Sequence, residues 1–158
     1  MPGAPSKRIG LVSDTHGLVR PEARAALAGV ELIVHAGDIG GVEVIEQLSD
    51  IAPVIAVRGN NDRGPWAARF AATEVVDIVG TFVYVVHDLA ELDLDPAAAG
   101  FHVVVSGHSH RPSIERRGDV LYVNPGSIGP RRFRLPVTLA LLDVAGTAAD
   151  ARIVELDV

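Results

Sequence analysis

The chain lacks cysteine altogether, and Lys7 is the only lysine among its fourteen basic residues. The absence of cysteine excludes disulfides, thiolate metal sites and a cysteine nucleophile. With its one lysine near the N-terminus, the chain offers neither a P-loop lysine nor a Schiff-base lysine inside the fold. Aromatic residues make up only 4% of the chain and the net charge is −6. Both values disfavour a nucleic-acid-binding protein, which needs stacking platforms and a basic face.

Long hydrophobic runs are also missing. No apolar run approaches the length that spans a bilayer, and the N-terminal stretch MPGAPSKR has no signal-peptide apolar core. We therefore expect a cytoplasmic protein without a membrane segment. The length of 158 residues predicts one domain covering residues 1–158, and 48% hydrophobic residues exclude a disordered chain.

The chain does contain many short Val-, Ile- and Leu-rich runs, separated by Gly, Pro, Asn and Asp. In the first half, apolar runs typical of strands alternate with patterns typical of helices. Strands are predicted at residues 8–14, 31–38 and 53–60, and helices at 20–29 and 41–50. This β-α-β-α-β order predicts a parallel sheet with helices packed on it.

The second half is predicted to be mostly β-structure. Residues 73–88 are expected to form two strands with a tight turn near Gly80, and residues 101–110 a buried strand. Hairpins are predicted at 113–124, turning at Gly118, and at 137–158. Residues 66–70 and 95–99 favour short helical turns. The predicted fold class is α/β: a two-sheet sandwich flanked by helices, with mixed parallel and antiparallel strands.

Five of the apolar runs end in side chains that can bind a metal ion. A single Asp at a strand end is usually a helix cap or a turn residue, but here four of the six histidines lie at such ends. If the runs pair in parallel, their carboxyl ends meet at one edge of the fold, where ligands bind in open sheets. The sequence therefore predicts a metal site formed by these strand ends: Asp14 and His16; Asp38; Asn60, Asn61 and Asp62; His87 and Asp88; His108 and His110.

The order of these motifs resembles the calcineurin-like metallophosphoesterases, especially their small bacterial and archaeal phosphodiesterase branch. The matching motifs are D-x-H, G-D, G-N-x-D, a single H and G-H-x-H, and N-P-G-S follows at residues 124–127. Each motif alone is weak, but five in order are specific. The resemblance spans about residues 9–127 and implies a metallophosphatase-like α/β/β/α sandwich.

The resemblance also implies a site for two divalent ions. Its first ion would be bound by Asp14, His16 and His110, its second by Asn60, His87 and His108, and Asp38 would bridge both. Imidazole and carboxylate ligands suit Mn, Fe, Ni, Zn or Co; we expect Mn²⁺, with Ni²⁺, Zn²⁺, Fe²⁺ or Mg²⁺ as alternatives. The implied activity is hydrolysis of a small phosphate ester, a diester rather than a monoester, by in-line attack of a hydroxide that bridges the two ions.

Two positions depart from the pattern of the family. Asn61 stands where many relatives have a histidine, and it can donate a hydrogen bond to phosphate but cannot supply a proton. Asp88 stands where relatives commonly have glycine; it would either orient His87 or cap the next segment. Asn60 and Arg131 are further candidates for substrate binding, and Arg131 could equally belong to a solvated basic loop.

Two histidines fall outside the strand ends. His35 is expected to be a core residue, with support of a metal ligand as the alternative, and His102 is expected to be structural. The alternative function is a catalytically weak metallophosphatase-like scaffold that binds a protein partner. The complete set of seven candidate ligands favours the enzyme. Exposed apolar surface could support a homo-oligomer, but no sequence feature establishes one.

Overall fold

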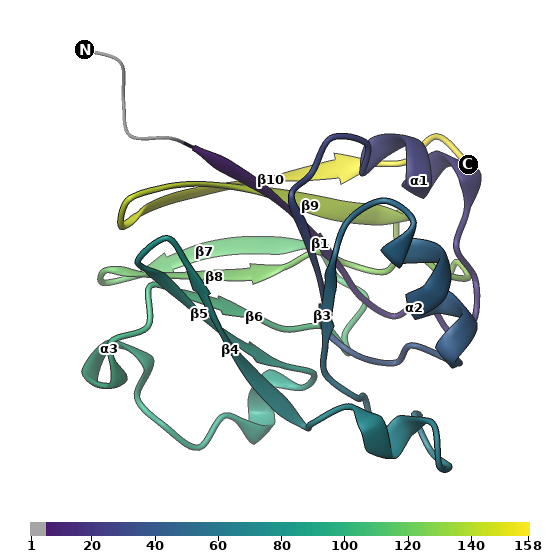
Figure 1. The fold of residues 1–158 in the computed structure, drawn as a ribbon, viewed down its shortest axis with the longest axis horizontal. Coiled ribbons are helices and arrows are strands. Elements are labelled where there is room, and N and C mark those ends of the chain that lie inside the picture. Colours follow the sequence, from purple (N-terminus) through teal and green to yellow (C-terminus); the bar gives the residue numbers. More distant parts are fainter. Residues whose placement is uncertain (1–5) are drawn as a thin grey trace.

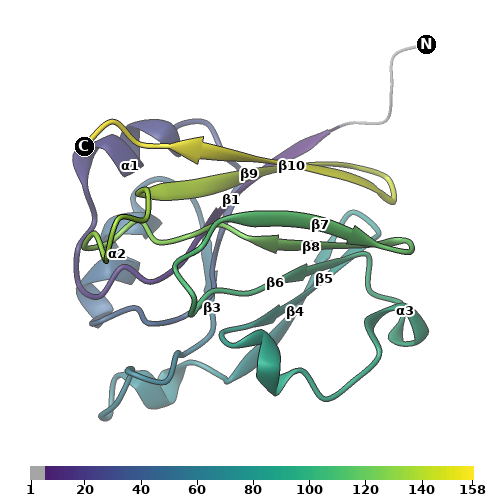
Figure 2. The same cartoon turned by 180° about the vertical axis from the view of Figure 1, so that it is seen from behind.

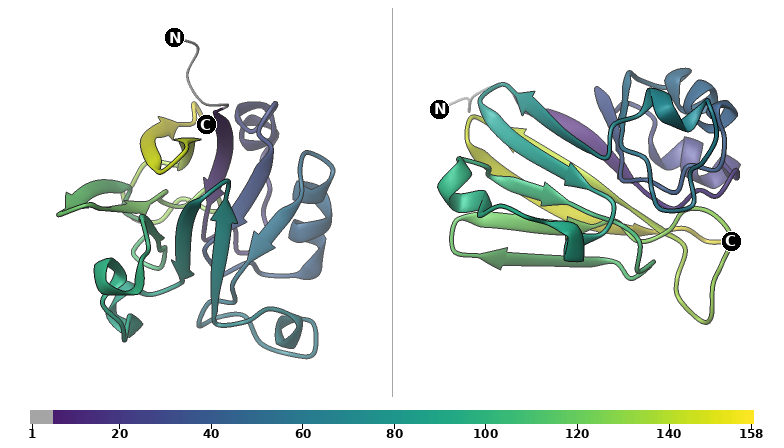
Figure 3. Two further views of the ribbon diagram at one scale, coloured as in Figure 1. Left: turned by 60° about the vertical axis from the view of Figure 1, so that its left-hand side comes forward. Right: turned by 90° about the horizontal axis from the view of Figure 1, so that it is seen from below.

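The computed structural model describes residues 6–158. Residues 1–5 lie outside the described residues. They are the first residues of the predicted 1–158 domain and of the stretch MPGAPSKR, which is expected not to be a signal peptide. The described part contains two five-stranded sheets that pack face to face. In the left view of Figure 3, the strands of the first sheet (yellow, purple and blue) lie above those of the second (green and teal).

The first sheet has the strand order β10-β9-β1-β2-β3. Strands β1, β2 and β3 run parallel, as the alternating order of strands and helices predicts, and the C-terminal hairpin β9-β10 continues the sheet antiparallel to β1. The strands are β1 (Lys7–Val12), β2 (Leu32–His35), β3 (Val54–Ala56), β9 (Thr138–Ala145) and β10 (Ala148–Glu155).

The second sheet has the order β4-β5-β6-β8-β7. Its three inner strands β5, β6 and β8 are parallel, and the hairpin partners β4 and β7 close the two edges antiparallel. The strands are β4 (Thr73–Ile78), β5 (Thr81–Val86), β6 (Val103–Val105), β7 (Ser113–Arg117) and β8 (Val120–Asn124). The predicted turns near Gly80 and Gly118 are confirmed, and both glycines have positive φ.

Helices cover the outer faces of the two sheets unequally. Helices α1 (Pro21–Ala26) and α2 (Val42–Ser49) pack on the first sheet, on the opposite side of the molecule from α3 (Pro96–Ala99) (Figures 1 and 2). Gly10 of β1 permits this contact, because a Cβ there would overlap the side chain of Leu27. The outer face of the second sheet is covered by the segment that contains the 3₁₀ turn η2 (Leu89–Glu91), from which Leu89, Leu92, Leu94 and Phe101 pack against the sheet. The turn η1 (Ala67–Arg69) is the helical turn expected at 66–70.

The main core lies between the sheets, where Val, Ile and Leu from both inner faces interdigitate. The predicted α/β sandwich with helices outside is therefore confirmed. The predicted helices at 20–29 and 41–50 are shorter than expected, and the last strand ends at Glu155. No helix in residues 6–158 has both the length and the apolar character that a membrane span requires.

Candidate metal centre

The strand register brings the predicted ligands to one edge of the sandwich. In the first sheet Val12 pairs with His35, which in turn pairs with Ala56, so the chain leaves β1, β2 and β3 at the same level. In the second sheet Val85 pairs with Val105. Each ligand motif begins a few residues beyond these pairs. The convergence predicted for the strand ends is thus produced by parallel pairing in both sheets.

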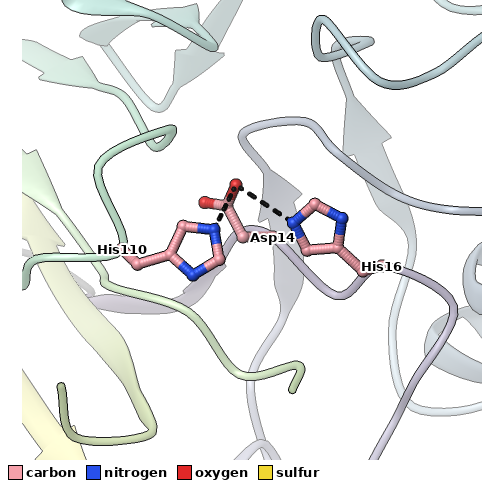
Figure 4. Close-up of side chains that lie close together, drawn as sticks. All are labelled: Asp14, His16 and His110. Carbon is pink, nitrogen blue, oxygen red and sulfur yellow. Dashed lines mark ion pairs between the residues drawn. The ribbon is translucent and has the colours of Figure 1, made fainter. Parts of the chain in front are cut away.

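Asp14, His16 and His110 form the first cluster (Figure 4). The carboxylate oxygen Oδ1 of Asp14 lies 3.4 Å from Nε2 of His110 and 3.9 Å from Nε2 of His16. Oδ1 of Asp14 has no hydrogen-bond partner in the described structure, and these spacings suit two ligands of a single ion at metal–ligand distances of about 2.0–2.2 Å. The three residues expected to bind the first ion therefore lie together.

Asp38 lies between this cluster and the second group of predicted ligands. Its Oδ2 is 3.7 Å from Nε2 of His16 and 3.4 Å from Nε2 of His87. One carboxylate oxygen thus faces a histidine of each predicted set, as a bridging ligand must. Asp14, Asp38 and His87 also offer ligand atoms within 4.8 Å of one another.

Asn60 and His108 lie at the exposed side of the centre. Oδ1 of Asn60 is 3.3 Å from Nδ1 of His108, and the rings of His108 and His87 are 5.2 Å apart. The first cluster has a similar ring spacing, 5.4 Å between His16 and His110. All seven predicted ligands are therefore neighbours, five of them enclosed and two at the solvent-facing edge.

Backbone geometry marks the same residues independently. Seven non-glycine residues in the described part have positive φ, and five of these are predicted ligands: Asp14, His16, Asp38, His108 and His110. This region is rarely occupied by residues other than glycine, although Asp, Asn and His tolerate it best. Strained backbone concentrates at functional sites because it is retained where side chains must point in a required direction.

Several buried polar atoms in the centre have no hydrogen-bond partner within the described structure. They include Oδ1 of Asp14 and Nε2 of His16 and His87. Buried polar atoms are almost always satisfied, so such a group requires an explanation. Nδ1 of His87 donates to the carbonyl of Ala36 at 2.7 Å, which leaves the Nε2 lone pair free for a metal ion. The residues present therefore fit divalent ions of the kind that the resemblance implies.

The charge states of the centre agree with this interpretation. Burial alone would raise the pKa of Asp14, but contacts with His110 and Ser13 outweigh it and the pKa is lowered. Burial likewise opposes the ionisation of Asp38, yet His87 and hydrogen bonds from Asn61 hold its pKa below the usual range. Both aspartates are thus kept as carboxylates, which is the form that binds a metal.

Comparison with known proteins shows the family to which the chain belongs. The sequence profile described as "Calcineurin-like phosphoesterase superfamily domain" matches residues 8–147. The chain belongs to this superfamily. A probable metallophosphoesterase of Methanothermobacter thermautotrophicus is 36% identical, and the match covers 92% of this chain and 91% of that protein. The phosphodiesterase MJ0936 of Methanocaldococcus jannaschii is 29% identical, over 86% and 92% of the two chains.

Solved structures share the fold of this calcineurin-like protein. Vps29 of Chaetomium thermophilum superimposes with a TM-score of 0.77 over 95% of this chain and 97% of its own, at 18% identity. At that identity the match shows the common fold alone. The family membership and the ligand types together show a metallophosphoesterase domain with candidate ligands for divalent metal ions.

Asp62 is a supporting residue of this calcineurin-like centre whose role the sequence did not reveal. Its buried carboxylate accepts hydrogen bonds from the backbone N–H groups of Ile39, Gly40 and Gly59, at 2.8–3.0 Å. Charge-assisted bonds of this kind are stronger than neutral ones. Asp62 therefore ties the loop that carries Asp38 to the loop that carries Asn60. The G-N-x-D pattern located Asp62 but not its partners.

The N-P-G-S segment, which begins at the end of β8, supports ligand loops of both sheets. Ser127 donates from its hydroxyl to the carbonyl of Asp14 at 2.9 Å, and Asn124 donates from its amide to the carbonyl of Gly107 at 2.9 Å. These bonds hold the backbone at Asp14 and next to His108 in place. The motif is thus explained by its hydrogen bonds to two carbonyl groups of the ligand loops. Sequence spacing alone could not identify these two partners.

Glycines beside the ligands allow close approach. A Cβ on Gly37 would lie 2.7 Å from Nδ1 of His87, and one on Gly59 would overlap the carboxylate of Asp38. Side-chain atoms cannot approach to these distances, so either position would force a ligand to move. The glycines of the G-D and G-N motifs are therefore required by the packing of the metal ligands.

His35 was expected to be a core residue, and it is fully buried, but it also links two ligand loops. Its Nδ1 accepts from the N–H of Gly37 at 3.0 Å, so its Nε2 carries the proton and donates to Thr15 Oγ1 at 2.9 Å. Thr15 donates in turn to the carbonyl of Ile39 at 2.7 Å. His102 has the expected structural role, since its Nδ1 accepts from the N–H of Phe82 at 2.9 Å.

Proposed function

We propose that this calcineurin-like protein hydrolyses small phosphodiesters with two divalent metal ions. The observation that carries the proposal is the position of Asp38, whose Oδ2 faces His16 on one side and His87 on the other. Asp14, His16 and His110 would hold one ion and Asn60, His87 and His108 the other, with Asp38 shared. Bound in this way, two divalent ions acidify water and neutralise the charge on phosphoryl oxygens.

The surroundings of the centre leave room for a small ester. A hollow of about 240 Å³ opens beside Asn60 and His87, lined also by Arg58, Ala72 and Glu91. It suits one substituent of a phosphodiester rather than a polymer, and no further recognition domain lies in residues 6–158. Of the metals, Mn²⁺ is proposed because oxygen and imidazole ligands without thiolate suit it.

The proposal is tested with metal-stripped protein and two chromogenic substrates, bis(p-nitrophenyl) phosphate and p-nitrophenyl phosphate. We expect no turnover without metal, turnover after Mn²⁺ is added, and faster hydrolysis of the diester than of the monoester. Ni²⁺, Zn²⁺ and Mg²⁺ are compared in parallel to rank the metals. Absence of turnover with all four metals would contradict the proposal and favour the scaffold that binds a protein partner.

Asn61 is proposed to contact the phosphate in place of a proton donor. Its side-chain amide donates to Oδ2 of Asp38 at 2.9 Å and its backbone N–H to Oδ1 at 2.9 Å, so its side chain lies beside the proposed bridging carboxylate. An amide cannot act as a general acid, and such catalysis contributes about 10²–10⁴-fold.

We expect the substitution Asn61→His to accelerate hydrolysis of diesters with poor leaving groups, by about 10²-fold, because the imidazole can protonate the departing oxygen. Activated nitrophenyl esters should change little. The check is the slope of log kcat against leaving-group pKa, which should become shallower. Asn61→Ala serves as the control for loss of the bond to Asp38; identical slopes in wild type and Asn61→His would refute the proposed role.

The loop of residues 128–136 carries three arginines, Arg131, Arg132 and Arg134, and we propose different roles for the first two. The guanidinium of Arg131, predicted from sequence to contact substrate, donates to the backbone carbonyls of Leu135 and Val158, both at 3.2 Å. Burial chiefly lowers the pKa of His16, Asp38 and Asp14 oppose this, and the positive charge of Arg132 is a lesser contribution that lowers it. Because the guanidinium of Arg131 is engaged by two carbonyl groups, we propose that Arg131 anchors the loop and that its neighbour Arg132 meets the phosphate.

The two arginines form a matched pair for mutation. Arg132→Ala is expected to raise KM for a phosphodiester by about tenfold, since a charge-assisted hydrogen bond contributes about 1.5–3 kcal/mol and an exposed one less. Arg131→Ala should leave KM within about twofold. Steady-state kinetics with the Mn²⁺ protein measure both values. A larger effect on KM from Arg131→Ala would restore Arg131 as the phosphate contact.

A further inference from the structure

Asp88, which stands where relatives commonly have glycine, is not needed to orient His87. The Nδ1–H of His87 already has an acceptor, the carbonyl of Ala36 at 2.7 Å. One oxygen of Asp88 does cap the turn η2, because Oδ1 accepts from the N–H of Ala90 at 3.0 Å. Of the two roles considered from sequence, the capping role is thus confirmed. Its second oxygen, Oδ2, points elsewhere: it lies 3.7 Å from Nε2 of His108.

His108 presents its two ring nitrogens to two different oxygens. Nδ1 lies within hydrogen-bond distance of Oδ1 of Asn60, at 3.3 Å, where an Nδ1–H would donate to the amide oxygen, and Nε2 faces Asp88. The spacing between Asn60 and His108 resembles the 3.4 Å between His87 and Asp38, which suits two ligands of one ion. If Nδ1 supplies the lone pair to a metal, the ring proton resides on Nε2, and it points towards the carboxylate of Asp88.

His108 has few other contacts that could hold its ring. The side chain is 45% exposed, in contrast to the enclosed rings of His87 and His110. Its backbone N–H donates to Oδ2 of Asp14 at 3.2 Å, which fixes the main chain but leaves the ring free to turn. An exposed ligand loses conformational entropy when it binds an ion, so a partner that fixes its ring favours binding.

We propose that Asp88 is a positioning residue that orients His108 for the second metal ion, through a carboxylate–histidine–metal arrangement. The inference rests on the proposed two-metal function and adds a residue to it. With an ion on Nδ1, the carboxylate that lies 3.7 Å from Nε2 in this structure would accept the Nε2–H of His108, fix the tautomer with a lone pair on Nδ1, and make that nitrogen more basic. Asp88 would do so while its other oxygen is held by the cap, which keeps the carboxylate in place.

Two capping aspartates make a matched test. Asp88→Ser keeps a hydroxyl that can cap η2 but is too short to reach His108. Asp95→Ser is the control, because Asp95 caps α3 in the same way, accepting from Ala97 and Ala98 at 3.1 and 3.4 Å, away from the centre. Metal-stripped wild type and both variants are titrated with Mn²⁺ by calorimetry, and thermal unfolding is followed separately.

The wild type and Asp95→Ser are expected to bind two ions with the same affinities. Asp88→Ser should bind its first ion normally and its second about 10–100-fold more weakly, the range found when outer partners of metal ligands are removed. Asp88→Asn keeps the cap through its amide oxygen but places an NH2 donor opposite the Nε2–H of His108, so it should weaken the second ion to a similar extent as Asp88→Ser.

The outcomes separate this inference from the proposed function. If wild type binds two ions and Asp88→Ser binds both with unchanged affinity, Asp88 does not position His108, while the two-metal proposal stands. Equal weakening of both ions, together with a lowered Tm, would mean that Asp88 acts only through the cap and would also overturn the inference. If the wild type itself binds fewer than two ions, the proposed function fails.

Discussion

The substitution Asp38→Asn is expected to lower kcat/KM for a chromogenic phosphodiester on the order of 10³-fold or more. This effect is at least as large as the loss seen in other enzymes when one hydrogen-bond donor to the transition state is removed. The carboxylate of Asp38 faces a histidine from each proposed set, so its loss weakens both ion sites at once. Its pKa is held low by its surroundings, and the neutral amide cannot replace that negative charge between two cations.

The Mn²⁺-loaded variant and wild type are compared by steady-state kinetics and by the number of ions retained after desalting. Asp77→Asn is the matched control, because Asp77 is exposed and its carboxylate only accepts from the N–H of Gly80 in the β4-β5 turn. The control should keep full activity and its metal ions. Wild-type activity in Asp38→Asn would show that the ions do not share Asp38.

The second large effect concerns stability and comes from His35. Burial lowers the pKa of this imidazole to about 4, against about 6.5 in the unfolded chain. Between these values the unfolded state binds a proton that the folded state does not, so the free energy of unfolding falls as the pH falls. The full stabilisation is present above pH 6.5, and roughly 3 kcal/mol of it is lost by pH 4.

Urea unfolding of metal-stripped protein at pH 7 and pH 5 measures this effect in wild type and His35→Gln. The variant should be less stable at pH 7, by about 2 kcal/mol, because the N–H of Gly37 loses its buried acceptor. It should lose less stability than wild type between pH 7 and 5. The raised pKa of His87 has the opposite effect, stabilising at low pH, but it is common to both proteins.

His102→Gln is the control for replacing a histidine that lies outside the centre. Its pH dependence should match that of wild type. If wild type and His35→Gln lose equal stability on acidification, the buried imidazole is not the group that couples folding to pH. That result would also contradict the inference that the neutral imidazole of His35 holds the ligand loops together.

The parallel pairing of the first three strands and the convergence of the polar strand ends could be predicted because both depend on local pattern. Each ligand directly follows an apolar run, and parallel pairing is the arrangement that β-α-β order requires. Asp14, Asp38 and His87 therefore converge as expected. The attachment of β9 and β10 to the edge of the first sheet was not predictable, because a hairpin pattern does not specify which sheet it extends.

The supporting contacts could not be predicted from sequence for a different reason. The contacts of Asp62, Asp88 and His35 depend on the directions of side chains at the ligands, where the backbone has positive φ. The spacing of residues in the sequence does not encode these directions. The same holds for Arg131, whose guanidinium contacts the carbonyl groups of Leu135 and Val158. Sequence located these residues within motifs or loops, and only the folded chain assigned their contacts.

The most direct test of the two-metal account is a crystal structure of the protein grown with Mn²⁺, with anomalous diffraction used to locate the ions. The account predicts two anomalous peaks. One should contact Asp14, His16 and His110, the other Asn60, His87 and His108, with Asp38 bound to both. A single peak, or two peaks with Asp38 bound to neither, would contradict it.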